Sequence, residues 1–374
     1  MKLVFASDTF KGSLSSVKIG ELLETAAHEV FPDAECITFP IADGGEGTLD
    51  AIEHVRPGER AAFESHDGLM RPVETSVFLC GESAFVEAAA TCGLTMLDMG
   101  ERNPLNTSSY GVGESICFAL DKGYESISIG LGGSCTNNGG MGCLRALGVR
   151  FYDDEGRELG GCGADLERVA RIDESGLHNC VHDVGFTIMS DVNNPLLGPN
   201  GATYVFGRQK GAGDRALARL ELGMRHYAET IAETHPDVDF DTAGFGAAGG
   251  LGMALAVFLG AQMRSGIEEL LYWFDFDATI DGADLVVTGE GKLDSQSLDG
   301  KVVSGVIAHA GRQGVPAAVI CGKLDLDEQQ LCNMDLAYVL ETGKGQTLEH
   351  AMAHAEENYL RSARELFANL RSAR

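Results

Sequence analysis

The sequence predicts an α/β protein of two domains, in which a second domain is inserted into a discontinuous first domain that contains a parallel sheet. Short apolar runs alternate with helical segments at both ends of the chain, which is typical of parallel strands covered by helices on both faces. The middle of the chain is less regular. The length of 374 residues also exceeds that of one ordinary domain, roughly 100 to 200 residues.

The first sixty residues have a βαβα pattern. An apolar run at residues 3–6 predicts a strand, and residues 15–30 follow with helical spacing, because Ile19, Leu22 and Ala26 share one face. A second strand is expected at residues 36–41. The spacing of Leu49, Ile52 and Val55 then predicts a second helix.

The C-terminal part repeats this pattern, with strands expected at residues 285–288, 317–320 and 336–340, a helix at 302–310 and a long final helix. Between the two ends, strand-like segments occur at residues 76–80 and 127–129 among many glycines. We therefore expect one domain from residues 1–60 together with 280–374, and an inserted α/β domain from residues 61–279.

The charge of the chain restricts its partners. Lys and Arg number 28 against 56 Asp and Glu, which gives a formal net charge of −28. Such a surface repels nucleic acid and anionic membranes. An anionic small molecule would need a local cation, a helix N-terminus or a metal ion at its site.

The ten cysteines show no C-x-x-C spacing, and we expect reduced, buried thiols in a cytoplasmic protein. The N-terminus reaches Ser7 and Asp8 before a signal-like apolar core could form, and no run of about 18 apolar residues occurs. The sequence thus predicts a protein without an export signal or membrane span.

Two glycine-rich segments with carboxylates each follow an apolar run: DGGEGT at residues 43–48 and TGEGKLD at residues 288–294. A glycine-rich turn after a buried strand brings backbone N–H groups close to a ligand, and adjacent carboxylates project into the same space. The pair predicts an active site that holds phosphate or a metal. The alternative is that Gly and Asp serve only the turns and helix caps.

Three further segments are candidates for binding. GLGGSCTNNGG at residues 130–140 has the composition of a phosphate cradle, or else of a tight buried loop. DVNNPL at residues 191–196 offers a metal or sugar-hydroxyl contact, although Asx residues before proline also form turns. GRQKG at residues 207–211 supplies positive charge, unless it is only solvated surface.

Two nucleotide motifs are weak or missing. No G-x-x-x-x-G-K-[ST] sequence occurs, so a P-loop site is unsupported. Residues 244–249 do satisfy G-x-G-x-x-G, but the acidic segment at 237–242 precedes them instead of a buried strand. No acidic ribose partner follows about 20 residues later.

The order and spacing of seven segments resemble the first family of bacterial glycerate kinases over essentially the whole chain; these segments are residues 6–14, 42–48, 130–142, 191–196, 206–212, 244–252 and 288–301. The resemblance implies an ATP-dependent kinase that phosphorylates D-glycerate to 2-phosphoglycerate with Mg²⁺. It also implies a Rossmann-like domain and a second α/β domain, with the active site in the cleft between them. The chain departs from the usual family pattern at Gly12, Asn138, Asn193 and Arg208.

The candidate site residues combine this resemblance with the strand-end argument, because phosphoryl transfer needs charge neutralisation, in-line positioning and a base. The catalytic candidates are Lys11, Asp43, Asp191 and Glu290, with Asp191 as the base or hydroxyl-orienting carboxylate. The substrate and phosphate candidates are Asp8, Ser13, Gly132, Gly133, Ser134, Asn137, Asn194, Lys210 and Lys301. The metal candidates are Glu46 and Asp294.

Other functions stay open at this point. The same chemistry could phosphorylate the 3-hydroxyl, giving 3-phosphoglycerate, or a related short hydroxy acid. A nucleotide-dependent oxidoreductase built on residues 244–249 and a non-catalytic small-molecule binding protein are further alternatives. We expect small-molecule partners, namely D-glycerate and ATP, and neither nucleic acid nor membrane; the sequence is compatible with a homo-oligomer.

Overall fold

A computed structural model of the protein describes residues 1–10, 12–41, 47–298 and 302–373. The chain divides into two compact units: unit 1 consists of Met1–Ala42 and Ile267–Arg374, and unit 2 of Asp43–Gly266. Both units contain parallel strands, which confirms the predicted α/β class. The domain boundaries expected near residues 60 and 280 stay predictions.

Unit 1 is built on a parallel sheet of five strands in the order β13-β12-β11-β1-β2. All neighbouring strands pair in parallel, so their carboxyl ends lie at the same edge of the sheet. Their bounds are β1 (Lys2–Phe5), β2 (Glu35–Thr38), β11 (Leu285–Leu293), β12 (Ala317–Leu324) and β13 (Tyr338–Glu341).

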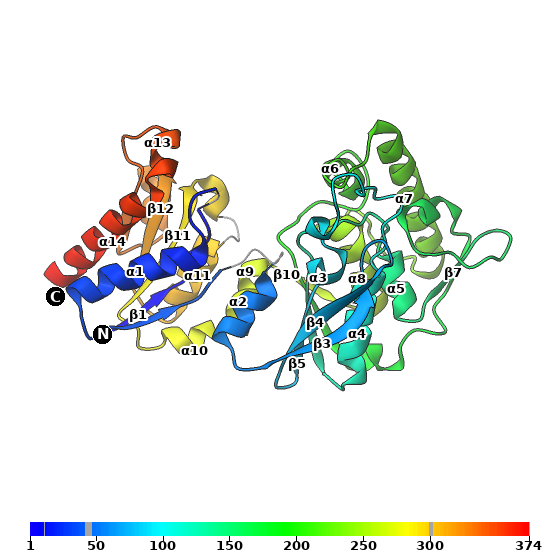
Figure 1. The fold of residues 1–374 in the computed structure, drawn as a ribbon, viewed down its shortest axis with the longest axis horizontal. Coiled ribbons are helices and arrows are strands. Elements are labelled where there is room, and N and C mark those ends of the chain that lie inside the picture. Colours follow the sequence, from blue (N-terminus) through cyan, green and yellow to red (C-terminus); the bar gives the residue numbers. More distant parts are fainter. Residues whose placement is uncertain (11, 42–46, 299–301, 374) are drawn as a thin grey trace. The chain divides into compact units, whose positions relative to one another are not determined.

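The two faces of this sheet are covered by different helices. Helices α1 (Ser16–Val30) and α14 (Ala355–Ser372) lie side by side over one face (Figure 1), where Phe5 and Phe367 pack in the core. Helix α11 (Val302–Arg312) packs against the other face through Val303, which contacts the cluster around Cys321. The remaining helices of unit 1 are α9 (Gly266–Trp273), α10 (Phe276–Ile280), α12 (Glu328–Asn333), α13 (Leu348–Ala353) and the 3-10 segment η5 (Ser295–Leu298).

Unit 2 contains a mixed sheet of six strands in the order β10-β9-β6-β5-β4-β3. One half, from β5 to β10, is parallel, and the other half pairs β3, β4 and β5 as antiparallel hairpins. The strands are β3 (Glu59–His66), β4 (Pro72–Cys80), β5 (Ser83–Glu87), β6 (Ser126–Gly130), β9 (Gly185–Met189) and β10 (Gln262–Arg264). A separate pair, β7 (Arg150–Tyr152) and β8 (Arg171–Asp173), is antiparallel.

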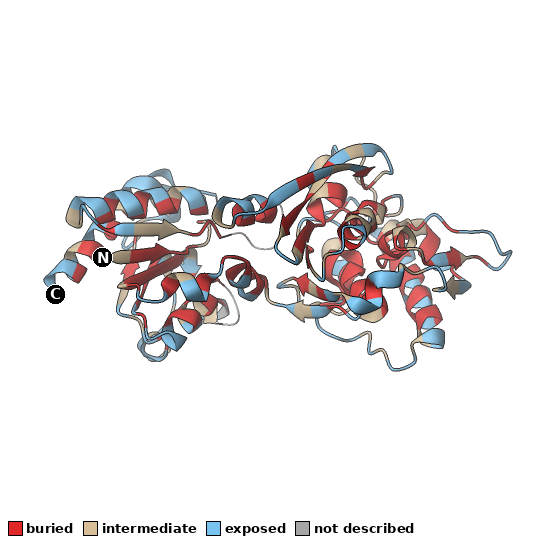
Figure 2. Cartoon of the chain, turned by 90° about the horizontal axis from the view of Figure 1, so that it is seen from below, coloured by how far each residue is buried: buried red, intermediate tan, exposed pale blue. Residues whose placement is uncertain are grey.

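A large apolar core joins this sheet to its helices and includes Ile129, Leu144, Tyr227 and Leu251, all buried. In both units the central strands are largely buried and the covering helices expose their outer faces (Figure 2). The helices of unit 2 are α2 (Thr48–Val55), α3 (Ala89–Cys92), α4 (Tyr110–Asp121), α5 (Met141–Ala146), α6 (Ala202–Phe206), α7 (Asp214–Thr234) and α8 (Leu251–Leu259), with 3-10 segments η1 (Leu94–Met96), η2 (Gly163–Arg168), η3 (Asn179–Asp183) and η4 (Ala247–Gly249).

Two sequence interpretations have clear structural outcomes. The segment at residues 288–294 is not a glycine-rich turn as expected, because β11 continues to Leu293 and pairs there with Leu324. Glycine is needed for close strand packing: a Cβ at Gly289 would lie 1.9 Å from the carbonyl oxygen of Ile320. The G-x-G-x-x-G motif follows turns at residues 236–245 instead of a strand, so the prediction that it lacks a dinucleotide-binding strand is confirmed.

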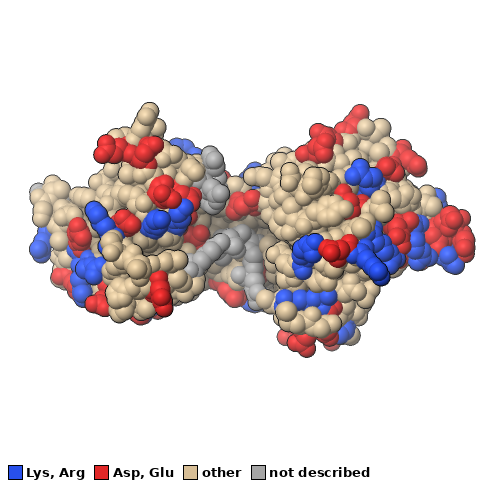
Figure 3. Space-filling model, turned by 90° about the horizontal axis from the view of Figure 1, so that it is seen from above, with Lys and Arg blue, Asp and Glu red and all other residues tan. Residues whose placement is uncertain are grey.

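The surface carries both signs of charge. On the face shown in Figure 3, Lys and Arg side chains lie among Asp and Glu side chains. Among the described residues, no helix combines the length and apolar character that crossing a bilayer requires.

Candidate functional site

Carboxylates from neighbouring strands lie at the carboxyl edge of the unit 1 sheet. The pairing of β1 with β11 continues to Asp8, whose N–H donates to the Gly289 carbonyl oxygen (2.9 Å) and which therefore lies beside Glu290. Glu290 pairs with Cys321, which in turn pairs with Glu341. In-register residues of parallel strands point to the same face. Glu290 and Glu341 therefore form an acidic row on one face of the sheet, and the backbone of Asp8, which follows β1, lies beside it.

The pKa of the Cys321 thiol is affected by the carboxylates on either side of it. Burial, followed by the negative charges of Glu341 and Glu290, raises the pKa of Cys321 to about 12. The thiol is thus a neutral core group and not a nucleophile at physiological pH. The chemistry available at this edge is that of the carboxylates.

Other candidates of unit 1 make local contacts. The Asp8 carboxylate accepts hydrogen bonds from the N–H (2.6 Å) and hydroxyl (3.3 Å) of Thr9. The hydroxyl of Ser13 donates to the Phe10 carbonyl oxygen at 3.0 Å, which is a turn contact. Asp294 forms an ion pair with Lys292 (2.9 Å). A metal at Asp294 would have to compete with this lysine.

Four of the predicted site residues, Lys11, Asp43, Glu46 and Lys301, lie outside the described residues. Their roles stay predictions. Within the described ranges, no group of three or more His, Cys, Asp or Glu side chains is arranged to hold a metal ion.

The carboxyl edge of the unit 2 sheet has a different character, because it contains a buried lysine. Lys210 is only 3% exposed, and its ammonium donates to the hydroxyl of Ser134 (3.1 Å) and the carbonyl oxygen of Thr136 (2.7 Å). No salt bridge joins it to a carboxylate in the described part of the chain. Burial lowers the pKa of Lys210 to about 8, so the cation persists at neutral pH without an ionic partner.

Asn137 lies in the same segment and is fully buried. Its side-chain amide donates to the hydroxyl of Thr203 (3.1 Å), while its Oδ1 has no hydrogen-bond partner among the described residues. Gly133 adopts φ +74°, which favours glycine, whereas Gly132 does not. The structure therefore places Lys210 in contact with Ser134, in the segment that also contains Gly132, Gly133 and Asn137. Binding of phosphate by this segment stays a prediction.

The neighbouring Asn138 has a structural role. Its amide donates to the Gly161 carbonyl oxygen (2.7 Å) and to the Ser109 hydroxyl (3.2 Å). These bonds lie in the buried core of unit 2. Position 138, where this chain departs from the usual family pattern, therefore makes hydrogen bonds inside the core of unit 2.

Asp191 and Asn194 follow β9. Asp191 is exposed, and its Oδ1 accepts from the N–H of Gly266 at 2.7 Å. The approach is close, since a Cβ at Gly266 would lie 2.8 Å from Asp191 Oδ2. Asn194 donates to the Asn200 carbonyl oxygen (2.8 Å) within a turn. Asp191 thus holds an ordered position at a strand end, whereas Asn194 stabilises the loop.

Glu87, at the last position of β5, was not among the predicted site residues. Its buried carboxylate accepts hydrogen bonds from the backbone N–H groups of Gly47, Leu49 and Thr48. Burial raises the pKa of Glu87 to about 7, although these hydrogen bonds lower it. The run at residues 84–86 followed by a glutamate is the sequence signal that could have identified this strand end.

Comparisons with known proteins are consistent with this geometry. Residues 3–371 match the model of the glycerate kinase family. The chain is similar to the glycerate 2-kinase of Escherichia coli (strain K12), with 41% identity over 99% of this chain and 98% of that protein. It is also similar to the glycerate kinase of Bacillus subtilis (strain 168), with 39% identity over 100% of this chain and 99% of that protein.

A crystal structure named as glycerate kinase 2 from Salmonella typhimurium LT2 has a similar fold. The TM-score is 0.84 with 41% sequence identity, and the match covers 100% of this chain and 99% of that one. The likeness therefore extends over both units.

Proposed function

The chain belongs to the glycerate kinase family and is a kinase that transfers a phosphoryl group from ATP to an alcohol group of glycerate, and from this premise we propose that it phosphorylates the 2-hydroxyl of D-glycerate. The products are 2-phosphoglycerate and ADP. The observation that carries the proposal is the 41% identity, over 99% of this chain, to a protein named glycerate 2-kinase.

Both substrates are anions, whereas the chain carries a formal net charge of −28. Local positive charge is therefore required to bind them. Lys210 supplies a buried cation that forms no salt bridge with the carboxylates described in unit 2. We assign Lys210, with Ser134, Asn137 and the backbone of residues 132–133, to the binding of a substrate phosphate or carboxylate.

Mg²⁺ is proposed as the metal that neutralises the phosphates of ATP. The carboxylates of Asp8 and Glu290, neighbours across β1 and β11, fit this ion. Mg²⁺ is usually held by one or two carboxylates together with phosphate oxygens and water, so a cage of three protein ligands is unnecessary. Glu46 and Asp294 remain proposed as further ligands.

Asp191 is proposed to orient the attacking hydroxyl or accept its proton. The contact of its Oδ1 with Gly266 fixes the carboxylate at the end of β9. We expect Asp191→Asn to lower kcat by about 10²- to 10⁴-fold, the usual contribution of a general base. An unchanged kcat would remove Asp191 from the reaction.

Ten cysteines without a disulfide support a reducing, cytoplasmic location for the chain. The thermal unfolding midpoint is measured for oxidised and for reduced samples. Equal midpoints would argue against a need for reducing conditions. A homo-oligomer stays a prediction.

One assay tests the substrate and the product together. ADP release is followed with D-glycerate and with L-glycerate, and the product is identified by phosphorus NMR. We expect turnover with D-glycerate and a single 2-phosphoglycerate signal. A 3-phosphoglycerate signal, or equal turnover of L-glycerate, would contradict the proposal.

A further inference from the structure

Helix α2 has no N-terminal cap of its own. It begins after Gly47, which has φ +89° and supplies no side-chain hydrogen bond. The first N–H groups of a helix have no partner within the helix and need an acceptor. Glu87 supplies it from the end of β5, because its carboxylate accepts from Gly47, Leu49 and Thr48. The cap is therefore contributed by a residue distant in sequence.

The backbone at Glu87 contacts a second glycine-rich segment. Glu87 pairs with Gly130 in the parallel ladder of β5 and β6, and the N–H of Ala88 donates to the Gly130 carbonyl oxygen at 2.9 Å. Gly130 begins the segment whose Ser134 accepts a hydrogen bond from Lys210. One residue therefore joins the start of α2, through its side chain, to residues 130–137, through its backbone.

A carboxylate at this position is unfavourable for stability. Glu87 is 8% exposed, its Oε1 has no hydrogen-bond partner in the described ranges, and no cation forms a salt bridge with it there. The charged group on α2 that faces it is Asp50, which raises its pKa further and is itself paired with Arg60 of β3. A glutamine would accept from the same N–H groups without a buried charge. Stability alone does not explain the glutamate.

We propose that Glu87 is a positioning residue for the kinase reaction, which fixes the start of α2 relative to the segment at residues 130–137. Charge-assisted hydrogen bonds from three successive backbone N–H groups restrict this geometry more tightly than bonds to a neutral acceptor would. The inference rests on the proposed function, because it assigns residues 130–137 to substrate binding.

The test compares Glu87→Gln with a matched control, Asp165→Asn. Asp165 is also a carboxylate at a helix start, and it accepts from the N–H groups of Gly161 (2.8 Å) and Cys162 (3.2 Å). For each variant, kcat and KM for both substrates and the thermal unfolding midpoint are measured at pH 8. We expect kcat of Glu87→Gln to fall about tenfold to a hundredfold, as for a small misplacement of a reactive group, with an unfolding midpoint no lower than that of the parent.

The control should behave in the opposite way, with a lower unfolding midpoint and a kcat within about twofold of the parent. The hydrogen bonds and ion pair described for the Asp165 carboxylate join it to Gly161, Cys162 and Arg168, and not to residues 47–49 or 130–137. The proposal is overturned if Glu87→Gln retains the parent kcat, or if its kcat and unfolding midpoint fall together. Should Glu87→Gln not fold, Glu87→Asp keeps the charge on a side chain one methylene shorter. A parent-like kcat in that variant would then overturn the proposal, and a reduced kcat would support it.

Failure of the proposed function is recognised separately. If the parent did not turn over D-glycerate, the substrate proposal would fail. The comparison of Glu87→Gln with Asp165→Asn would then be made with the hydroxy acid that the parent does phosphorylate, and the same two outcomes would decide the role of Glu87.

Discussion

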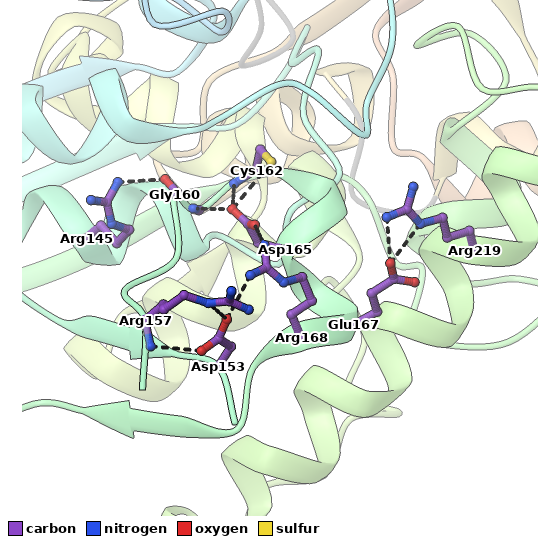
Figure 4. Close-up of polar contacts among 10 residues, drawn as sticks. Arg145, Asp153, Arg157, Gly160, Cys162, Asp165, Glu167, Arg168 and Arg219 are labelled. Carbon is purple, nitrogen blue, oxygen red and sulfur yellow. Dashed lines mark hydrogen bonds and ion pairs between the residues drawn. The ribbon is translucent and has the colours of Figure 1, made fainter. Parts of the chain in front are cut away.

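Two groups of charged side chains within unit 2 differ in how their charges are balanced. One is a network of arginines and carboxylates around η2 (Figure 4), in which Asp153 accepts from Arg157 (2.9 Å) and Arg168 (2.8 Å). The other consists of Lys210 and Glu87, which are buried without a salt bridge among the described residues. Both groups remove charges from water, but only the first pairs them with opposite charges.

The presence or absence of an opposite charge determines the direction in which each pKa shifts. Burial alone would raise the pKa of Asp153, yet the backbone N–H of Arg157 and the guanidinium groups of Arg157 and Arg168 hold it at about 2. Burial lowers the pKa of Lys210 to about 8 and raises that of Glu87 to about 7. Folding thus favours the charged form of Asp153 and disfavours the charged forms of the other two. We therefore expect the paired charges to serve stability and the unpaired charges to serve the proposed function.

The largest effect that would test this comparison is expected for Lys210→Met. Loss of a buried cation at a phosphate or carboxylate site should lower kcat/KM about 10²- to 10³-fold. Removing the charge relieves a penalty of about 3 kcal/mol, from the shift of the pKa to about 8. The buried carbonyl oxygen of Thr136 loses its donor, at a cost of about 1 to 3 kcal/mol. The free energy of unfolding should therefore change by less than about 2 kcal/mol, as measured by urea denaturation.

The matched control is Lys122→Met, since Lys122 is an exposed lysine of the same unit. Its kcat/KM should equal that of the parent. If the Lys210→Met variant kept more than a third of the parent kcat/KM, Lys210 would have a structural role, as Asp153 does, and not a role in substrate binding.

The reverse behaviour is expected for Asp153→Asn in the arginine network. This change should lower stability and leave kcat/KM within about twofold of the parent, because the amide cannot balance two guanidinium groups. A carboxylate with a depressed pKa stabilises the fold above its unfolded pKa, and this contribution is lost as the pH falls toward about 2. Acid unfolding followed by circular dichroism should therefore show a smaller loss of stability between pH 4 and 2 for the variant. If Asp153→Asn lost activity while its stability stayed equal to that of the parent, the structural role of Asp153 would be refuted.

The smallest effect concerns two turns with the same hydrogen bonds. Asp67 accepts from the N–H (2.9 Å) and guanidinium (2.6 Å) of Arg71, as Asp153 does from those of Arg157 (2.8 and 2.9 Å). The fourth turn position has positive φ in both, but it is Met70 (φ +62°) in one and Gly156 (φ +77°) in the other.

Met70→Gly should therefore stabilise the protein by about 1 kcal/mol, and Gly156→Ala should destabilise it by about the same amount, through backbone strain alone. No atom lies within 4 Å of a Cβ at Gly156, so a steric clash does not contribute. Urea unfolding midpoints would measure both changes. Effects of the same sign would contradict the strain argument.

Local patterns in the sequence were sufficient for much of the fold. The helix expected at residues 15–30 is α1, for which Ser15 provides the cap by accepting from the N–H of Lys18. The strand-like segment at residues 127–129 lies in β6, which is followed by the predicted glycine-rich segment. These elements depend on residues close in sequence, where periodicity and capping are informative.

Non-local contacts were not predictable in the same way. The bond from Lys210 to Ser134 spans 76 positions, and only the folded chain shows that this lysine is buried. Glycines 289 and 291 predicted a turn, because the sequence does not show that a neighbouring strand approaches closely there. Glu87 was missed because its partners, at the start of helix α2, are distant from it in sequence.

The most direct test of the functional assignment of unpaired charges is the pH dependence of kcat/KM for D-glycerate in the unmodified protein, since kcat/KM reports the pKa values of the free enzyme. If the charged form of Lys210 binds substrate, kcat/KM should fall tenfold per pH unit above about 8 while circular dichroism remains unchanged. In the same range the folded state loses the Lys210 proton before the unfolded state does, so stability relative to Lys210→Met should rise between pH 8 and 10.5. A kcat/KM that stays constant to pH 9.5, or that falls only where the protein unfolds, would contradict the account.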